Sequence, residues 1–396
     1  MSPQRVLLGL LASNGDCLYG TTVARQIKKD HPGCHLVWGI SSRCRHLLAN
    51  NPDVDEVWEF PFFDWAHYAD NWHAFEKAAR HMVASGQFDS AWFLQISPGV
   101  ETLRNYDGTI RPSLFRNYGA PITVPIQSVL RPDALEKERA EHFIKRTGFS
   151  SYDHRIVFEC HSKSRQSFMT PELALNVAQR LVEKLPGVCV VLSSHMPVDT
   201  NHPAILDGSQ LTMRETAVLL GHCTLFAGCG SGITVIATCI EQASPHLPVV
   251  QMLSADTALY ASFARDFDYW GLSSERFIES YDPNPEHMAD MIKDVCRNGV
   301  CQAKTRWHQP VPLTFDFYLN LAPRPLLAQG HAEAAAHSLL LAGKRFGWNE
   351  TLDSFAATEL LPQLENAASR GCDQAAQRLA ELSDLRHHWD GQDQPD

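Results

Sequence analysis

The sequence contains no hydrophobic run long enough to cross a membrane. Its most apolar stretch near the start, Val6 to Ala12, is interrupted at once by Ser13-Asn14-Gly15-Asp16. A spanning helix needs about 20 apolar residues, and so short a run does not make a clean secretory signal either. We interpret the stretch as a buried strand and expect a cytoplasmic protein, with a peripheral position at the inner membrane as the alternative.

The sequence also lacks an excess of positive charge. Its 34 Lys and Arg stand against 45 Asp and Glu, which makes a formal net charge of −11. No overall positive field therefore draws the protein to nucleic acid, and we expect no nucleic-acid partner. Any anion that the protein binds must be held by a local site.

No cysteine or histidine pattern typical of a disulfide framework or a metal site is present. The eleven cysteines are scattered, and the only close pairs are Cys223 with Cys229 and Cys296 with Cys301. None of the nineteen histidines forms a helical pair with metal spacing. We therefore expect reduced thiols, no metal and no cofactor.

What the sequence does contain is a regular alternation of strand and helix patterns. A chain of 396 residues is too long for one core, so two domains are expected. In the first half we expect strands at 5–11, 35–40, 54–60, 90–95 and 122–126, and helices at 21–30, 42–50, 67–84 and 132–147. In the second half we expect strands at 155–159, 188–193, 224–227 and 249–253, and helices at 171–185, 213–222, 233–241 and 285–296.

This alternation predicts an α/β fold of two Rossmann-like domains. We place the domains at 1–150 and 151–325, with a break at Gly148 to Ser151. Residues 326–396 change to Ala and Leu at helical spacing and form a helical C-terminal extension. The extension is expected to pack across the domains or against another subunit, so that a homo-oligomer could form through these helices.

The first polar loop of interest follows the first strand. It is SNGDCLYGT, Ser13 to Thr21, and it carries Asp16 at the expected carboxyl edge of the sheet. Asp16 is a candidate general base. On spacing alone, a residue that only caps a turn or a helix start is the more common interpretation.

Two further loops could hold phosphate. ECHSKSRQSFMT, Glu159 to Thr170, brings hydroxyls and cations together, which suits a diphosphate, although a solvated surface loop is an equal interpretation. FAGCGSGITV, Phe226 to Val235, ends a strand in glycines and opens a helix, whose unpaired amides can hold phosphate oxygens. Lys163 in the first of these loops is a candidate catalytic residue, and the candidate donor-binding residues are Ser162, Arg165, Gly228, Gly230, Ser231 and Gly232.

Taken together, these segments resemble the family 9 glycosyltransferases, the heptosyltransferase family of bacterial lipopolysaccharide core synthesis. The resemblance is spread over most of residues 5 to 300. It rests on the opening RVLLGLLASNGDCLYGTTVARQIKKDHPGCHLVWGI, on NNPDVDEVWEF and on LTMRETAVLLGHCTLFAGCGSGITVIATCI. It implies a GT-B fold, with an acceptor-side first domain and a nucleotide-sugar-binding second domain facing each other across a cleft.

The resemblance also implies roles for single residues. Asp16 matches the proposed catalytic base, which deprotonates an acceptor hydroxyl, and Lys163, with Arg165, matches a basic residue at the diphosphate. Ser231 and Gly232 match the Ser/Thr-Gly pair that meets donor phosphates. Two positions depart from the family pattern, because Gly230 stands where the family has Asp and Val235 replaces a frequent His. We expect residues 61–72 and 97–116 to shape the acceptor side.

The function implied is an inverting, metal-independent glycosyltransferase. Its donor is a nucleotide-diphosphate sugar, with ADP-heptose as the default, and its acceptor is a glycan, a lipid-linked glycan or a protein side chain. Two alternatives stay open: a sugar-nucleotide epimerase or hydrolase of the same fold, and a non-catalytic nucleotide- or glycan-binding subunit. The missing Asp at Gly230 favours the last of these.

Overall fold

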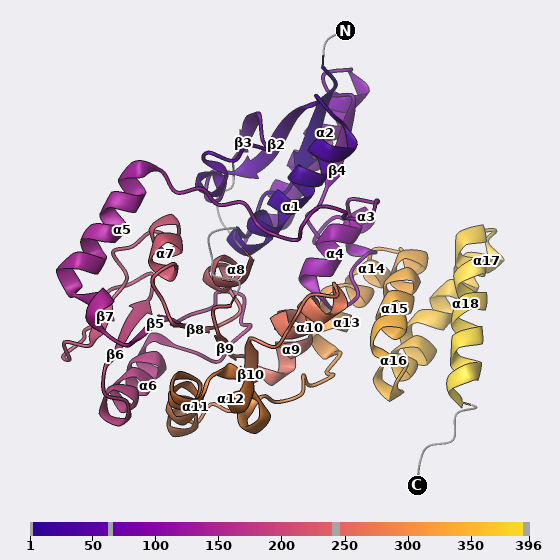
Figure 1. Cartoon of the computed structure of the whole chain (residues 1–396). Coiled ribbons are helices and arrows are strands. Elements are labelled where there is room, and N and C mark those ends of the chain that lie inside the picture. Colours follow the sequence, from indigo (N-terminus) through magenta and orange to yellow (C-terminus); the bar gives the residue numbers. More distant parts are fainter. Residues whose placement is uncertain (1–2, 62–65, 240–245, 391–396) are drawn as a thin grey trace.

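The computed structural model describes residues 3–61, 66–239 and 246–390. The first domain contains a parallel sheet in the order β3-β2-β1-β4 (Figure 1). Its strands are β1 Arg5–Gly9, β2 His35–Ser41, β3 Glu56–Phe60 and β4 Ser90–Phe93. Its helices are α1 Asn14–Asp30, α2 Tyr68–Ala84, α3 Val100–Leu103, α4 Ile110–Arg116 and α5 Ala134–Thr147.

The second domain contains a parallel sheet of six strands in the order β10-β9-β8-β5-β6-β7. Its strands are β5 His154–Glu159, β6 Val188–Ser193, β7 Ile205–Asp207, β8 Leu225–Gly228, β9 Val249–Met252 and β10 Phe277–Ser280. Its longer helices are α6 Pro171–Lys184, α7 Met213–Leu220, α8 Gly232–Cys239, α11 Pro285–Asn298 and α12 Val300–Trp307. Two short helices, α9 Ala258–Ala261 and α10 Phe263–Tyr269, precede β10.

Both sheets reverse their strand order at one point. Counted along the chain, the second sheet runs 3-2-1-4-5-6, the order of Rossmann folds, and the first sheet runs 3-2-1-4. The order reverses between β1 and β4 and between β5 and β8. Ligands of such sheets bind outside the carboxyl ends of the strands at this switch point. The predicted α/β fold with two Rossmann-like parallel sheets is therefore confirmed.

Helix α1 begins at Asn14, so the predicted loop Ser13 to Thr21 is wrong. Ser13 and Asp16 form a capping box that starts the helix seven residues earlier than expected. The glycines do not break it because they serve packing. A Cβ on Gly20 would lie 2.7 Å from Leu10 and 2.8 Å from Trp38, so only glycine lets the helix lie this close to the sheet.

Two other predicted elements differ from the structure, and several observed elements were not predicted. The predicted helix 42–50 is only a 3-10 helix, Arg45–Leu48. The predicted strand 122–126 does not form. The amides of Thr123 and Val124 donate to Gln26 Oε1 of α1, at 2.7 and 3.0 Å, and the flanking Pro121 and Pro125 supply no N–H to a sheet. The strands β7 and β10 and the helix α12 were not predicted, because the strands are short and the helix lacks a clear apolar period.

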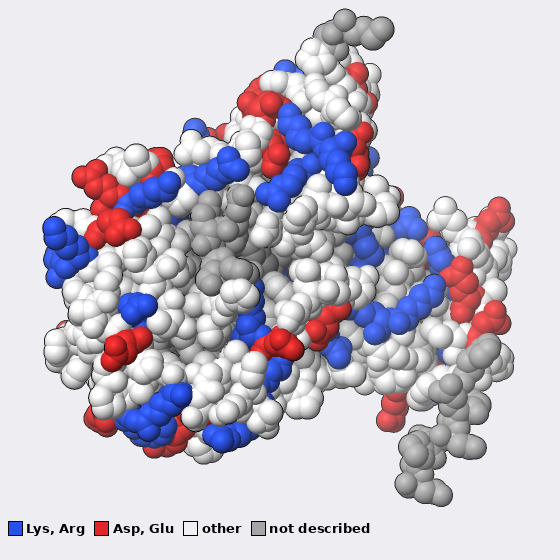
Figure 2. All heavy atoms as spheres, viewed as in Figure 1, with Lys and Arg blue, Asp and Glu red and all other residues white. Residues whose placement is uncertain are grey.

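The C-terminal extension is helical, as predicted. Its helices are α13 Asp316–Leu321, α14 Pro323–Ala328, α15 Ala332–Phe346, α16 Glu350–Phe355, α17 Leu361–Ser369 and α18 Asp373–Asp390. A π-helical turn, Ala356–Leu360, joins α16 to α17 where Pro362 removes an amide donor. Within the described residues, no helix is long and apolar enough to cross a bilayer. On the face seen in Figure 2, acidic and basic side chains are interspersed.

The extension packs across the two domains of its own chain. From α15, Ser338 Oγ donates to the carbonyl of Tyr106, and Arg345 lies 3.0 Å from Asp107 of the first domain and 3.3 Å from Asp266 of the second. Figure 1 shows these helices as a stack beside α3 and α4. The prediction that the extension packs across the two domains is thus confirmed. Its contact with another subunit stays a prediction.

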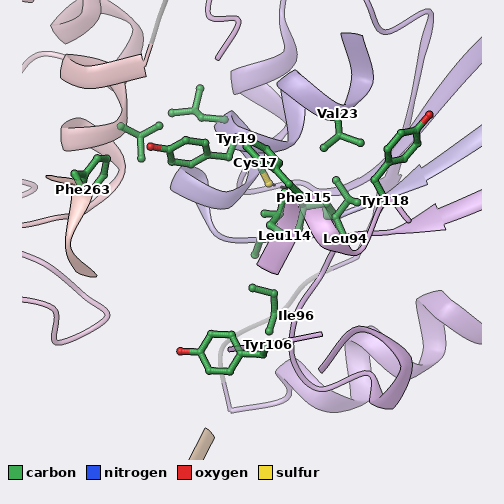
Figure 3. Packing of buried hydrophobic residues seen from close by; sticks show 14 of the residues in the cluster. Cys17, Tyr19, Val23, Leu94, Ile96, Tyr106, Leu114, Phe115, Tyr118 and Phe263 are labelled. Carbon is green, nitrogen blue, oxygen red and sulfur yellow. Dashed lines mark hydrogen bonds between the residues drawn. The ribbon is translucent and has the colours of Figure 1, made fainter. Parts of the chain in front are cut away.

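The two domains share a hydrophobic core. The ring of Tyr19 on α1 lies 6.2 Å from Phe115 on α4, 6.5 Å from Phe263 on α10 and 5.9 Å from Trp270, all between ring centroids. Figure 3 shows Tyr19 pointing toward Phe263 of the second domain. Burial of large aromatic surfaces contributes much of the free energy of such a contact, so the domains are held together by an apolar interface as well as by charges.

Candidate functional site

The carboxyl edges of the two sheets meet at the first turns of α1 and α8. A Cβ on Gly232 would lie 3.3 Å from Asn14 Cβ and 3.5 Å from the amide nitrogen of Gly15. The helix starts therefore touch, and the positive ends of two helix dipoles converge at one place. The structure thus brings the first turn of α1, which carries Asp16, together with the predicted glycine turn at Ser231 and Gly232.

Asp16 is half-buried beside this junction. Its Oδ2 accepts hydrogen bonds from the amide and the hydroxyl of Ser13, both at 3.2 Å. Burial raises the pKa of Asp16 to about 6, against the lowering effect of these bonds and of the Arg111 charge. The capping role is confirmed by this geometry. The role as a general base stays a prediction, and a pKa near 6 suits it because proton transfer is most efficient near the working pH.

Two tyrosines lie close enough to Asp16 for its charge to shift their pKa values. Burial raises the pKa of Tyr68 on α2 and that of Tyr260 on α9, and the Asp16 carboxylate raises both further. The phenol of Tyr68 donates to the carbonyl of Ser97. Tyr68 lies in the segment 61–72 that was predicted to shape the acceptor side, whereas nothing in the sequence around Tyr260 points to a site.

The glycine turn already holds an internal anion. The carboxylate of Glu159, at the end of β5, accepts from the amides of Cys229 at 2.8 Å and Ile233 at 3.2 Å. It also accepts from the hydroxyl of Thr234 at 2.7 Å and from that of Ser231. Some of the hydrogen-bond donors of this turn are thus already paired with Glu159 and not with a diphosphate. The first amides of a helix have no acceptor within it, and those of Ser231 and Gly232 are not among the donors to Glu159, so their contact with a donor phosphate stays a prediction.

Glu159 is therefore expected to be essential for the fold of the turn. Glu159→Gln places an NH₂ group against one or two of these donors, and Glu159 is only 2% exposed. Buried donors left without acceptors destabilise, so we expect the free energy of unfolding to fall by about 2–4 kcal/mol. Chemical denaturation measures this change. The matched control is Glu172→Gln at the exposed first turn of α6, and equal stabilities of the two variants would refute the expectation.

The basic loop after β5 exposes its charges. Lys163 and Arg165 are exposed, and neither side chain forms an ion pair with a described residue. The hydroxyl oxygen of the buried Ser162 lies 3.2 Å from Ser164 Oγ, within hydrogen-bond distance. Thr257 Oγ1 donates to the carbonyl of Arg165 at 3.1 Å, which pins the loop to the segment after β9. Contact of either cation with a diphosphate stays a prediction.

Gly228 and Gly230 are needed for different reasons. A Cβ on Gly228 would lie 2.4 Å from the ring of Phe226 and 2.6 Å from Thr234 Oγ1, so this glycine serves packing. Gly230 adopts a φ of +76°, where other residues are strained, and its amide donates to Thr234 Oγ1 at 3.1 Å. Contact of either residue with a donor stays a prediction.

Of the predicted acceptor side, residues 62–65 lie outside the described residues. Much of the other segment, 97–116, is committed to packing. Arg111 donates to the carbonyls of Ala261 at 3.0 Å and Ser262 at 2.8 Å in the second domain. No group of three His, Cys, Asp or Glu within the described ranges could hold a metal ion.

Comparison with known proteins gives structural similarity alone. No family model matches the chain, and neither does any curated protein. Among solved structures, the chain is similar to the glycosyl transferase family 9 protein from Veillonella parvula, with 14% identity and a TM-score of 0.51 over 83% of this chain and 98% of that one. It is also similar to the E. coli heptosyltransferase WaaC with ADP, with 12% identity and a TM-score of 0.46 over 75% and 100% of the two chains.

A putative UDP-N-acetylglucosamine 2-epimerase from Listeria monocytogenes is similar too, with 12% identity and a TM-score of 0.44 over 83% of this chain and 97% of that one. At these identities only the fold follows, and the last two matches are too weak to carry an argument. The predicted resemblance to family 9 is confirmed at the level of structure. The chain has the GT-B fold, which it shares with the Veillonella parvula glycosyl transferase.

Proposed function

We propose that the protein is a glycosyltransferase that takes a sugar from a nucleotide-diphosphate donor. The observation that carries the proposal is the meeting of Asp16, a carboxyl with a pKa of about 6, and the first turn of α8 at the switch points of the two sheets. One side offers a base for an acceptor hydroxyl, and the other offers amides for a leaving diphosphate.

In this proposal the roles follow the positions of the residues. Asp16 removes the proton of the acceptor hydroxyl as its oxygen attacks the anomeric carbon, and inversion follows from a single displacement. The amides of Ser231 and Gly232 face the phosphates, and the exposed Lys163 and Arg165 stabilise the charge that grows on the departing diphosphate. The proposed donor is ADP-heptose by default, no metal takes part, and the acceptor is a glycan, a lipid-linked glycan or a protein side chain.

A second candidate is a subunit that binds nucleotide or glycan without catalysis. The internal carboxylate of Glu159 favours it, because this anion engages two amides and two hydroxyls that a diphosphate would use. A GT-B epimerase or hydrolase is the third. It would release or convert the sugar in the absence of an acceptor, which a transferase does not do at a comparable rate.

The test is a thermal-shift titration with ADP, UDP, GDP and their sugar adducts. A ligand at 100 times its Kd stabilises the native state by about 2.7 kcal/mol, so we expect one nucleotide to raise the Tm by several degrees. Lys163→Ala and Arg165→Ala should each raise the Kd of that nucleotide about 10- to 100-fold, because each removes a charge-assisted contact. Lys137→Ala on the exposed face of α5 is the control. No shift with any nucleotide would overturn the proposal.

A further inference from the structure

One buried polar group faces the candidate site without a partner. Gln166, in the loop after β5, is only 6% exposed, and its Oε1 accepts no hydrogen bond from any described residue. Buried polar atoms are nearly always satisfied in native proteins, so an unpaired oxygen at a candidate site points to a ligand atom. The sequence offers no signal for it, since Gln166 lies among the more conspicuous Lys163, Arg165 and Ser167.

The orientation of Gln166 is fixed by its surroundings. Its side chain lies beside the phenol of Tyr260 and acts to lower the pKa of that group, against the larger effect of burial, which raises it. Its backbone carbonyl accepts from the amide of Ser254 at 3.0 Å. This backbone contact ties the loop to the segment after β9, and the side chain is buried there.

The oxygen points into the space above Gly230. A Cβ on Gly230 would lie 3.2 Å from Gln166 Oε1 and 3.2 Å from Leu253 Cδ2. Any side chain at position 230 would therefore compete with the glutamine oxygen. Because Gly230 has no side chain, Oε1 stands beside the glycine turn at this position.

The chemistry of this oxygen selects its partner. An amide carbonyl is an uncharged acceptor, whereas an ionised phosphate oxygen is itself only an acceptor and cannot bond to it. A hydroxyl group can. We propose that Gln166 Oε1 accepts a hydrogen bond from a hydroxyl of the donor's sugar, which makes Gln166 a specificity-determining residue for the transferred sugar. This inference rests on the proposed function.

Gln166→Met tests it, because methionine keeps the length and burial of the side chain but has no carbonyl. With the nucleotide that shifts the wild-type Tm, calorimetry should show an unchanged Kd for the nucleoside diphosphate and a Kd for its sugar adduct weakened about tenfold. Gln302→Met on the exposed face of α12 should change neither. Equal effects on both ligands, or no effect on either, would overturn the inference while leaving the proposed function in place.

The ligand side gives a second measurement that needs no variant. Deoxy analogues of the sugar adduct, each lacking one hydroxyl, should bind the wild-type protein about tenfold more weakly at one position only. Gln166→Met should be insensitive to that same position. If every deoxy analogue binds as the parent does, the inference is wrong. If the wild-type protein binds no nucleotide at all, the proposed function and this inference fall together.

Discussion

Asp266→Ala is expected to lower the free energy of unfolding by about 3–5 kcal/mol, because it leaves buried guanidinium groups without their anion. The Asp266 carboxylate, 1% exposed, pairs with Arg111 Nε from the first domain and lies 3.3 Å from Arg345 Nη2 of the extension. Burial raises the pKa of Asp266 and the two arginines lower it. The residue thus joins all three parts of the chain at one buried point.

The neighbouring carboxylate is held in the same way. Asp107 lies 2.8 Å from Arg116 and 3.0 Å from Arg345. Although burial acts to raise its pKa, the charges of Arg116 and Arg345 bring the pKa below the usual value. Asp107 can compensate in part for a loss at position 266 through Arg345. Arg111 Nη2 donates instead to carbonyls of the second domain.

Denaturant titration and thermal unfolding measure the effect of Asp266→Ala. A loss of this size corresponds to a fall in Tm of about 10 °C for a protein of several hundred residues. Asp268→Ala, at an exposed position two residues later, is the matched control and should change the Tm by less than about 2 °C. If the two variants were equally stable, the buried charges would not hold the domains together.

Asp16→Asn should lower the rate of sugar transfer by about 100- to 10,000-fold, the usual contribution of a positioned general base. Asparagine can still accept the hydrogen bonds of Ser13 and so preserve the capping box, but it takes up no proton. The wild-type rate should rise with pH through about 6, where Asp16 loses its proton, and reach a plateau above it. The residual rate of the variant should not show this rise.

The fold of Asp16→Asn should survive at neutral pH. The pKa of Asp16 is about 6 in the folded protein, against 3.8 for an ordinary aspartate, so the folded state binds more protons between about pH 4 and 6. The contribution of Asp16 to the free energy of unfolding therefore falls as the pH rises from about 4 to 6 and is constant above about 6. Asparagine does not titrate, so Asp16→Asn removes this loss. Asp373→Asn in the exposed first turn of α18 is the control. A variant with normal transfer rates would exclude Asp16 as the base.

Local sequence patterns predicted much of the secondary structure. The strand around Val6 to Leu8 is buried and apolar, and such a run between polar turns is typical of a strand covered on both faces. Helices α5, α6 and α11 follow from an N-cap Asp, Thr or Asn, with Pro at the first helical position in the last two. Strand β7 has only three residues, too few for a pattern to show.

The candidate site was predicted in outline and missed in detail. Asp16 and the glycine turn were found because each stands just beyond an apolar strand, where parallel sheets place ligands. Glu159 and Gln166 were missed because nothing in a sequence tells whether a polar residue after a strand faces solvent or folds back onto a buried turn. Burial and the partners of a side chain depend on residues far along the chain, such as Thr234, which lies 75 positions from Glu159.

By itself, the sequence determined the class of fold, the two Rossmann-like domains and the helical character of the extension, because strand and helix periods are local properties of the chain. Only the tertiary structure decided that α1 starts at Asn14 against α8, that Glu159 fills part of the glycine turn and that the extension locks onto Asp107 and Asp266. These features depend on pairs of residues far apart in the chain. Their free energies come from burial and charge pairing, which exist only once the domains have packed.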